Sequence, residues 1–492
     1  MDEMKKEHQK LHIAVFPWLA FGHFLPFLHL SNHLVQMGHR ISFLSTPKNL
    51  RRLSQIAPNL SSLVTMVPLP LSPVHGLPDS AESTSELPFH LVPYLKRAYD
   101  QLQLPLTQFL HNSDVNWLIY DFAPHWLPPI ASRLGINSVF FSIFNASTLA
   151  FMGSPEEILR RCQQQVENLT VVPEWIPFPS TVAFRIHEVT RIQDCMDSEA
   201  SDFFRLAKVI EGCRFVATRS CAELEGDSLS LLENLYQKPV VPIGLLPTEV
   251  NDSEGDESWG SLRQWLDEKT ENSVLYVALG SELTLSQDEM NELASGIEKS
   301  GLPFIWVVKT KDDPIITGFE GRVSGRGLVW ANWAPQKQIL AHPSVGGFLT
   351  HCGWSSVIEA LGLGRVLILF PGPSSDLGLV ARLLEGKRVG LEVPRDKRDG
   401  SFTGDSVSKS IKRVMVEEEG EQLRRNAWAM REIFGNVKLQ TKYLDEFTRV
   451  LENDSVVTKS TWSINSKLME ISTFSLRKLI KALFHPRINI LL

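Results

Sequence analysis

The sequence lacks several features that mark particular classes of protein. Its five cysteines are scattered over 492 residues without a CxxC pair, which argues against a disulfide framework or a structural zinc site and suits a reducing compartment. No stretch reaches the roughly 18 uninterrupted apolar residues of a membrane-spanning helix. The first ten residues are charged and no apolar h-region of a signal peptide follows them, so no secretory signal is visible. We therefore expect a soluble, cytoplasmic protein.

The net charge of the chain is modest, and its length exceeds that of one ordinary domain. A net charge of −7 gives no reason to expect nucleic acid as a partner, because proteins that bind nucleic acid show basic faces. The length suggests two domains of about 200 residues each. Residues 246–259 are acidic and contain Pro, Gly and Ser, which is typical of a linker. We therefore predict an N-terminal domain of residues 1–245 and a C-terminal domain of residues 260–435.

The order of the expected elements favours an α/β fold in both domains. Each domain has a buried strand, a short turn, a helix and a second strand, which indicates a parallel sheet covered by helices. In the N-terminal domain these elements are expected at residues 11–19, 20–23, 24–37 and 40–45. In the C-terminal domain they are expected at residues 273–278, 279–282, 287–300 and 304–308. We predict two doubly wound, Rossmann-like domains.

Two polar residues follow buried strands of the N-terminal domain. His23 comes in the turn after the first strand, and Asp121 directly follows a second apolar run at residues 115–120. Ligands of parallel sheets bind beyond the carboxyl ends of the strands, and both side chains are expected there. A carboxylate beside an imidazole fixes its tautomer and makes the histidine a useful general base. The alternative is that His23 is an ordinary polar loop residue and that Asp121 caps a helix or bonds to a loop.

The stretch from Trp333 to Leu377 combines an apolar run with many polar residues. The pattern of residues in this stretch predicts three elements. They are a short buried strand at 345–350, a tight turn at 351–354 and the start of a helix at 355–363. The backbone N–H groups at the start of that helix form an anion site, with His351 and two serines beside it. This arrangement suits a diphosphate. The alternative is a buried structural turn.

This stretch resembles the signature box of the plant family 1 UDP-sugar glycosyltransferases, which make glycosides of small lipophilic metabolites. The residues that carry the resemblance are Trp333-Ala334-Pro335-Gln336, the run Val345 to Ser356 with its His351-Cys352-Gly353-Trp354, then Glu359 and Asp376. The resemblance extends over residues 11 to 453. It implies the GT-B architecture, in which two Rossmann-like domains face each other across a cleft. It also implies that the helix in 436–453 packs back on the first domain.

The resemblance further implies a role for each site residue. His23, oriented by Asp121, takes the proton of an acceptor hydroxyl, which expels UDP and inverts the anomeric centre. Trp333 stacks on uracil, Ala334 binds it through its backbone, and Gln336 and Glu359 hold the ribose. Trp354 and Asp376 face the sugar. The diphosphate is met by helix N–H groups and by Ser281, His351, Gly353, Ser355 and Ser356. The UDP-sugar is the donor substrate, and no metal or cofactor is expected.

Two residues depart from the pattern of the family. Ser355 stands where Asn is usual, and its shorter side chain predicts a phosphate contact that is lost or mediated by water. Leu377 stands where Gln is usual, and a leucine cannot form a hydrogen bond with a sugar hydroxyl. This motivates the hypothesis that the donor carries a 6-deoxyhexose such as rhamnose, or a pentose, in place of glucose.

The acceptor is expected to be a lipophilic small molecule. Residues 58–105 and 141–190 predict long irregular segments that suit a pocket for a bulky molecule, the alternative being loose loop packing. Residues 18–27 and 281–302 look most like the branch-forming subgroup, whose members extend the sugar of a flavonoid, terpenoid or steroid glycoside.

Two other classes of function stay open. A nicotinamide dehydrogenase would need GxGxxG after the first strand, where Ala20-Phe21-Gly22-His23 stands. A catalytically impaired protein that binds UDP-sugar is the second.

The tail of residues 454–492 has no counterpart in the family. Residues 455–492 of this tail hold six basic residues and one acidic residue, and the spacing of apolar residues in 475–485 predicts an amphipathic basic helix. Such a helix suits a peripheral contact with a membrane. The alternative is an extension without function.

Overall fold

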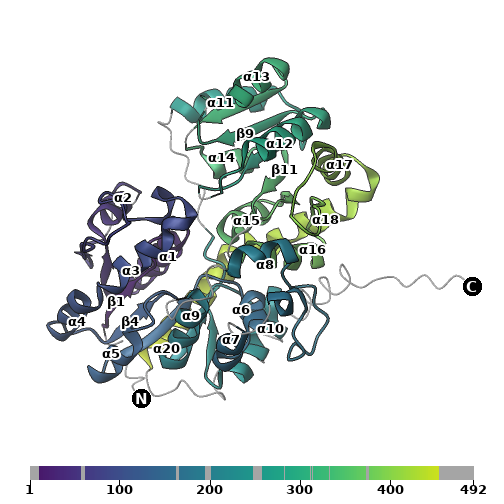
Figure 1. Cartoon of the computed structure of the whole chain (residues 1–492). Coiled ribbons are helices and arrows are strands. Elements are labelled where there is room, and N and C mark those ends of the chain that lie inside the picture. Colours follow the sequence, from purple (N-terminus) through teal and green to yellow (C-terminus); the bar gives the residue numbers. More distant parts are fainter. Residues whose placement is uncertain are drawn as a thin grey trace, which may run out of the picture. The chain divides into compact units, whose positions relative to one another are not determined.

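Two compact units form the protein in this computed structural model (Figure 1). The structure describes residues 10–56, 61–161, 166–193, 201–247, 257–281, 283–310, 312, 314–331, 333–372 and 376–453. Of these residues, unit 1 contains those up to 161, those from 201 to 246 and those from 438 to 453. Unit 2 contains the others.

The core of unit 1 is a seven-stranded parallel sheet. The strands lie in the order β3-β2-β1-β4-β5-β6-β7. They are β1 (His12–Phe16), β2 (Arg40–Ser45), β3 (Val64–Pro68), β4 (Trp117–Tyr120), β5 (Asn137–Ser142), β6 (Phe215–Thr218) and β7 (Val240–Pro242). All residues of β1, β4 and β6 are buried, because helices cover both faces of the sheet. The strand order reverses between β1 and β4, which is where ligands bind to doubly wound sheets.

The helices of unit 1 connect these strands and cover the sheet (Figure 1). They are α1 (Phe21–Gln36), α2 (Pro47–Ile56), α3 (Val92–Asp100), α4 (Gln103–His111), α5 (Leu127–Arg133), α6 (Ala146–Met152), α7 (Pro155–Arg161), α9 (Asp202–Gly212), α10 (Ala222–Tyr236) and α20 (Val437–Glu452). The last of them, α20, returns to the sheet from the far end of the described chain. Trp117 on β4 donates through Nε1 to the carbonyl of Leu451 at 3.1 Å, and Leu245 N donates to Gln440 Oε1 at 2.6 Å.

Unit 2 repeats the doubly wound plan. Its six parallel strands lie in the order β10-β9-β8-β11-β12-β13, so the reversal falls between β8 and β11. The strands are β8 (Val274–Ala278), β9 (Phe304–Val308), β10 (Gly327–Ala331), β11 (Val345–Thr350), β12 (Val366–Leu369) and β13 (Gly390–Glu392). The helices are α8 (Ile186–Gln193), α11 (Glu257–Asp267), α12 (Gln287–Ser300), α13 (Pro314–Arg322), α14 (Gln336–Ala341), α15 (Trp354–Gly362), α16 (Leu377–Gly386), α17 (Gly404–Met415), α18 (Glu421–Ala429) and α19 (Arg431–Phe434). The predicted α/β fold class with two Rossmann-like units is confirmed.

Two segments that were predicted as irregular contain regular elements. Residues 58–105 include β3 and α3, and residues 141–190 include α6, α7 and the start of α8. Proline occurs at the start of two of these helices, because it is compatible with the first turn of a helix. Pro93 lies in the first turn of α3, and Pro155 is the first residue of α7. A third difference concerns the turn predicted at residues 20–23. The helix α1 begins at Phe21, because His23 N and Phe24 N both donate to the carbonyl of Ala20.

The segment of residues 166–193 packs with unit 2, although the predicted N-terminal domain of residues 1–245 includes it. A buried ion pair joins this segment to the rest of unit 2, since Arg382 Nη2 on α16 lies 2.5 Å from both carboxylate oxygens of Glu188 on α8. Figure 1 shows α8 beside α16. Of the predicted linker at residues 246–259, residues 248–256 lie outside the described residues, and α11 begins at Glu257.

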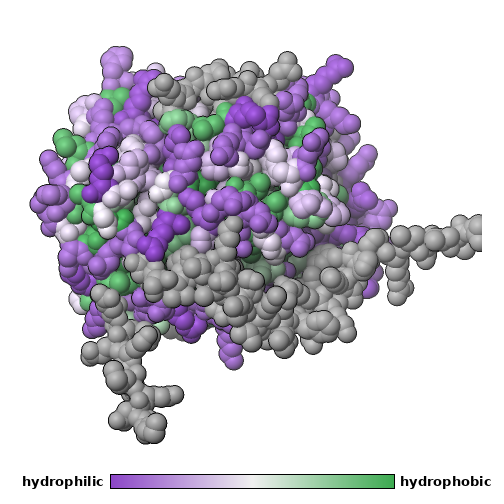
Figure 2. Space-filling view, turned by 90° about the horizontal axis from the view of Figure 1, so that it is seen from below, coloured by the Kyte–Doolittle hydropathy of each residue, from purple (hydrophilic) through white to green (hydrophobic). Residues whose placement is uncertain are grey.

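The surface mixes hydrophilic and hydrophobic residues. On the face shown in Figure 2, hydrophilic side chains are interspersed with small groups of hydrophobic ones. Among the described residues, no helix is both long and apolar enough to cross a membrane. The predicted amphipathic helix at 475–485 and its membrane contact lie outside the described residues.

Candidate active site

His23 and Asp121 lie side by side at the carboxyl edge of the sheet in unit 1. Their positions follow from the parallel pairing of β1 with β4, in which Phe16 is opposite Tyr120. His23 is in the first turn of α1, and Asp121 is the residue after β4. The distance from His23 Nδ1 to Asp121 Oδ2 is 2.7 Å. In this contact Nδ1–H donates to the carboxylate, so Nε2 is the ring nitrogen that can accept a proton.

The carboxylate of Asp121 is buried and fixed by backbone donors as well. Its side chain is only 1% exposed. Oδ2 also accepts a hydrogen bond from Trp18 N at 3.0 Å, and Oδ1 accepts one from Phe122 N at 2.7 Å. The hydrogen bonds from these two backbone N–H groups replace those that the carboxylate loses with water when it is buried. Asp121 is therefore held in one orientation before any ligand binds.

Aromatic rings surround this pair. The ring of Phe122 lies 5.8 Å from that of His23, and Phe122 contacts Trp18 and Phe144 at centroid distances of 6.0 and 6.1 Å. Aromatic side chains offer a large apolar surface to a ligand. The neighbourhood of the candidate base thus suits an apolar acceptor.

The predicted diphosphate site is the turn between β11 and α15 in unit 2. Cys352 in this turn has a φ of +72°, a left-handed backbone conformation that costs about 1 kcal/mol or more for a residue other than glycine. Gly353 is the N-cap of α15 and makes no side-chain cap bond. Trp354, Ser355 and Ser356 occupy the first turn of this nine-residue helix, whose backbone N–H groups carry partial positive charge. The local geometry is that of an anion site.

His351 is wedged between two glycines of unit 2. A Cβ atom on Gly280 would lie 2.7 Å from His351 Nε2, and one on Gly353 would lie 2.6 Å from the same atom. Gly280 precedes Ser281 in the turn after β8, so the imidazole connects this turn with the start of α15. Burial lowers the pKa of His351 to about 4. The ring is therefore neutral at pH 7 and can meet a phosphate only as a neutral hydrogen-bond donor.

The predicted ribose-binding residues contact each other. Gln336, the first residue of α14, donates through Nε2 to Glu359 Oε2 at 2.7 Å and to Ser356 Oγ at 3.3 Å. Trp333 lies just before this helix and is 76% exposed, so a flat ring is presented at the surface of unit 2. Its carbonyl accepts a bond from Trp330 Nε1 at 3.1 Å, and Ala334 beside it is buried.

The predicted sugar-binding end lies at the start of α16. Asp376 is the N-cap of this helix and Leu377 is its first residue. A Cβ atom on Gly372 would lie 3.1 Å from Leu377 Cδ1 and 3.3 Å from Leu283 Cδ1. Leu377 at the start of α16 and Leu283 in the loop after β8 thus lie against the same glycine, so the surface there is apolar where a glutamine would make it polar.

The structure groups the predicted site residues by unit. His23 and Asp121 belong to unit 1, and Ser281 together with the stretch from Trp333 to Leu377 belongs to unit 2. The described residues contain no group of three or more His, Cys, Asp or Glu side chains that could hold a metal ion. Sequence reasoning did not single out Glu188, Glu289 or Arg395, which line a hollow of unit 2. No short motif marks them, since they come from three distant segments.

Two doubly wound units, one with a His–Asp pair after its strands and one with a tight turn before a helix N-terminus, favour an enzyme that acts on a nucleotide-linked substrate. The family model "UDP-glucoronosyl and UDP-glucosyl transferase" matches residues 234–374. The chain is 48% identical to UDP-glycosyltransferase 91C1 of Arabidopsis thaliana, over 91% of this chain and 98% of the relative. It is 38% identical to a soyasaponin III rhamnosyltransferase of Glycine max, over 91% of this chain and 97% of that relative. The chain therefore belongs to the UDP-glycosyltransferase family.

A solved structure is also similar to this fold. The crystal structure of Arabidopsis thaliana UGT89C1 complexed with UDP-L-rhamnose superposes with a TM-score of 0.71 at 25% identity. The match covers 90% of this chain and 99% of that chain. The protein is a plant-type UDP-glycosyltransferase with the GT-B fold.

Proposed function

We propose that this glycosyltransferase moves a sugar from a UDP-sugar to a hydroxyl of a lipophilic plant metabolite, with inversion at the anomeric carbon. His23 Nε2 takes the proton of the acceptor hydroxyl while the hydroxyl oxygen attacks the anomeric carbon. The bond from that carbon to the UDP oxygen breaks, and UDP leaves with the electron pair. The observation that supports this most directly is the 2.7 Å contact between His23 Nδ1 and the buried carboxylate of Asp121. The carboxylate stabilises the imidazolium that forms.

Unit 2 supplies the groups that hold UDP in this proposal. The exposed ring of Trp333 stacks on uracil beside the backbone of Ala334, and Gln336 and Glu359 bind the ribose hydroxyls. The charge that develops on the diphosphate is met by the N–H groups at the start of α15, with Ser281, His351, Gly353, Ser355 and Ser356 around them. The neutral state of His351 lets its ring donate one hydrogen bond without burying a second charge.

For the donor sugar we propose a 6-deoxyhexose or a pentose, bound between Trp354 and Asp376. The contacts of Leu377 and Leu283 with Gly372 make an apolar surface that suits a methyl group or a missing hydroxymethyl group. A buried sugar hydroxyl facing two leucines would lose its hydrogen bonds with water, at a cost of about 1–3 kcal/mol. The name of the Glycine max relative, a rhamnosyltransferase, is consistent with this donor class.

The proposed acceptor is a flavonoid or terpenoid glycoside whose sugar is extended. The aromatic surroundings of His23 suit the apolar part of such a molecule. The soyasaponin acceptor in the name of the same relative is a glycosylated terpenoid, which supports this class. A cytoplasmic location and the independence from metals and cofactors stay predictions.

A matrix of UDP-sugars against flavonoid and triterpenoid glycosides, with product mass as the readout, tests the proposal. We expect a product with UDP-rhamnose or a UDP-pentose, and a clear preference for UDP-glucose would contradict the proposed donor. The variant His23→Ala should lose turnover and keep its affinity for UDP, measured by calorimetry. A wild-type protein that binds UDP but transfers no sugar from any donor would favour the impaired, UDP-sugar-binding alternative.

A further inference from the structure

A buried carboxylate lies against the start of α16, the helix that carries Leu377. It belongs to Glu188 in the first turn of α8, whose side chain is 4% exposed. A Cβ atom on Gly378, the second residue of α16, would lie 2.5 and 2.6 Å from the two carboxylate oxygens of Glu188. The three atoms nearest to that Cβ all belong to Glu188. The carboxylate therefore occupies the space that any side chain at position 378 would need.

Three polar contacts hold the carboxylate of Glu188 in this position. Arg382 Nη2, one turn further along α16, lies 2.5 Å from both of its oxygens. Arg185 N donates to Oε2 at 2.7 Å, just before the start of α8. Glu188 cannot turn away from Gly378 without breaking a buried ion pair, which is costly. The start of α16 is thus packed against a group that is itself fixed.

Asp376 and Leu377 are tied to this first turn of α16. Asp376 is the N-cap, and its carbonyl accepts a hydrogen bond from Val380 N at 3.0 Å. Leu377 directly precedes Gly378. The N–H groups of a first helical turn carry partial positive charge, so a carboxylate beside Gly378 is also electrostatically favourable. A shift of this turn would move Asp376 and Leu377 with it.

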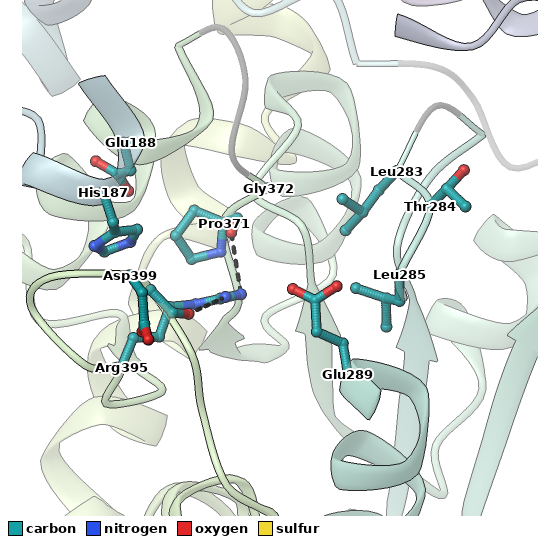
Figure 3. Close-up of a pocket in the computed structure, with 11 residues that line it drawn as sticks. His187, Glu188, Leu283, Thr284, Leu285, Glu289, Pro371, Gly372, Arg395 and Asp399 are labelled. Carbon is teal, nitrogen blue, oxygen red and sulfur yellow. Dashed lines mark hydrogen bonds between the residues drawn. The ribbon is translucent and has the colours of Figure 1, made fainter. Parts of the chain in front are cut away.

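Glu188 also borders the chain before Asp376. It lines a small hollow together with Pro371 and Gly372, which follow β12 (Figure 3). A Cβ atom on Gly372 would lie 3.1 Å from Leu377 Cδ1. The carboxylate is therefore adjacent to residues on both sides of Asp376, at positions 371–372 and 378.

The segment that supplies Glu188 contacts α16 at a second place. Thr181 Oγ1 donates to the carbonyl of Arg382 at 3.1 Å, and a Cβ atom on Gly386 would lie 3.0 Å from the same Oγ1. Thr181 and Glu188 lie between β5 and β6 in the sequence but belong to unit 2. A segment from the first half of the chain thus holds the helix at whose start the donor sugar is proposed to bind.

We propose that Glu188 is a positioning residue for the donor sugar. It fixes the start of α16, and through it the places of Asp376 and Leu377, without touching the sugar. The proposal rests on the function proposed above, in which the sugar binds at these two residues. The nucleotide is held there by α14, α15 and the turn after β8, so the affinity for UDP itself should not depend on Glu188.

Calorimetry with UDP, UDP-rhamnose and UDP-glucose, without acceptor, tests this role in the full-length protein. The quantity of interest is the affinity for each UDP-sugar divided by that for UDP. In Glu188→Gln an NH₂ group would face the guanidinium of Arg382 in place of an oxygen, so the side chain would leave its position. We expect the ratio for the preferred donor to fall about tenfold while the affinity for UDP stays unchanged.

The matched control is Glu392→Gln, which makes the same change in the same ion cluster. Glu392 is buried and accepts from Arg382 Nη1 at 3.0 Å, but it is not among the atoms nearest to Gly378. Its variant should lose stability and keep the ratio of the wild type. A further variant, Gly378→Ala, keeps every charge and displaces the start of α16 by a clash, so it should lower the ratio as Glu188→Gln does. Thermal melting checks that each variant is folded, and Gly378→Ala decides the matter if Glu188→Gln is not.

Asp376→Asn separates a failure of this inference from a failure of the proposed function. A lower ratio in Asp376→Asn together with a normal ratio in Glu188→Gln or Gly378→Ala would overturn only the role of Glu188. Equal losses in Glu188→Gln and Glu392→Gln would overturn it as well, because a general loss of stability would then explain both. So would an equal loss of affinity for UDP and for UDP-sugar. A normal ratio in Asp376→Asn would refute the proposed place of the donor sugar, and the role of Glu188 with it.

Discussion

One carboxylate oxygen of Asp121 accepts from His23 Nδ1 at 2.7 Å and from Trp18 N at 3.0 Å, so the same atom positions a ring and a loop. The two residues of the pair are 98 positions apart in the chain. Parallel pairing of β1 with β4 brings them together, since each follows the carboxyl end of its strand. The orientation of His23 is thus coupled to the backbone that carries the aromatic side chain of Trp18.

Asp121→Asn should reduce turnover by about 10²-fold or more, with little change in UDP affinity. An amide has a single oxygen, whereas Asp121 accepts three hydrogen bonds through two oxygens. The amide nitrogen would face a backbone N–H or the imidazole, and the ring would lose its fixed tautomer. Turnover is measured with the best donor and acceptor pair, and UDP affinity by calorimetry. Near-normal turnover would show that Asp121 does not support His23.

Gly280→Ala should destabilise unit 2 and weaken UDP binding, because its Cβ would lie 2.7 Å from the His351 ring. Gly301→Ala is a matched control. Both glycines have a left-handed φ, +73° and +74°, but nothing lies within 4 Å of a Cβ at Gly301. Both variants pay the backbone strain of about 1 kcal/mol, and only Gly280→Ala adds the clash. Urea unfolding should show a larger loss of stability for Gly280→Ala than for Gly301→Ala. Equal losses would refute the position of His351 between the two glycines.

The stability of unit 2 should fall as the pH decreases from 6.5 toward 4. Burial lowers the pKa of His351 in the folded state to about 4 from its usual 6.5, so in this window the unfolded chain binds a proton that the folded chain does not. Between pH 7 and 5 this costs roughly 1–2 kcal/mol. Urea unfolding at both pH values should show a smaller pH dependence for His351→Gln than for the wild type. The same slope in both proteins would contradict the assignment.

Arg382→Met should destabilise the protein by about 3–5 kcal/mol, because the buried Glu188 would lose the cation that it pairs with, and Glu392 would keep only its pair with Arg185. Arg425→Met serves as the control. Arg425 forms an exposed pair with Glu421 on the surface of α18, and its loss should cost less than about 1 kcal/mol. Chemical denaturation measures both. A small effect of Arg382→Met would mean that the ion pair does not hold α8 on α16.

Leu377→Gln should shift donor preference toward UDP-glucose, by about tenfold in the ratio of kcat/KM values. The amide can form a hydrogen bond with a sugar hydroxyl that a 6-deoxyhexose or pentose lacks. Leu377→Met keeps the site apolar at a similar volume and should leave the ratio unchanged. Competition between UDP-rhamnose and UDP-glucose, read by product mass, measures the ratio. An unchanged ratio in Leu377→Gln would remove this residue from donor selection.

Elements with a clear pattern of apolar residues were the most predictable part of the fold. The spans expected at residues 40–45, 304–308 and 345–350 for strands, and at 287–300 for a helix, coincide with β2, β9, β11 and α12. Residues 58–105 and 141–190 were predicted as irregular, although they contain α3, α6 and α7, which are helices of only seven to nine residues. Packing against the sheet stabilises such helices, and local sequence does not reveal it.

The two doubly wound units, the turn at His351 to Trp354 and the polar residues after strands β1 and β4 could all be predicted from the amino-acid sequence. These depend on hydrophobic pattern and on residues close together in the chain. Three other features became visible only in the folded chain: Asp121 Oδ2 holds His23, two glycines confine His351, and Glu188 pairs with Arg382 across 194 positions. The hollow lined by Glu289 and Arg395 is likewise visible only in the folded chain. Its walls come from segments that meet only when the chain folds, because contacts between distant segments leave no periodic trace in the sequence.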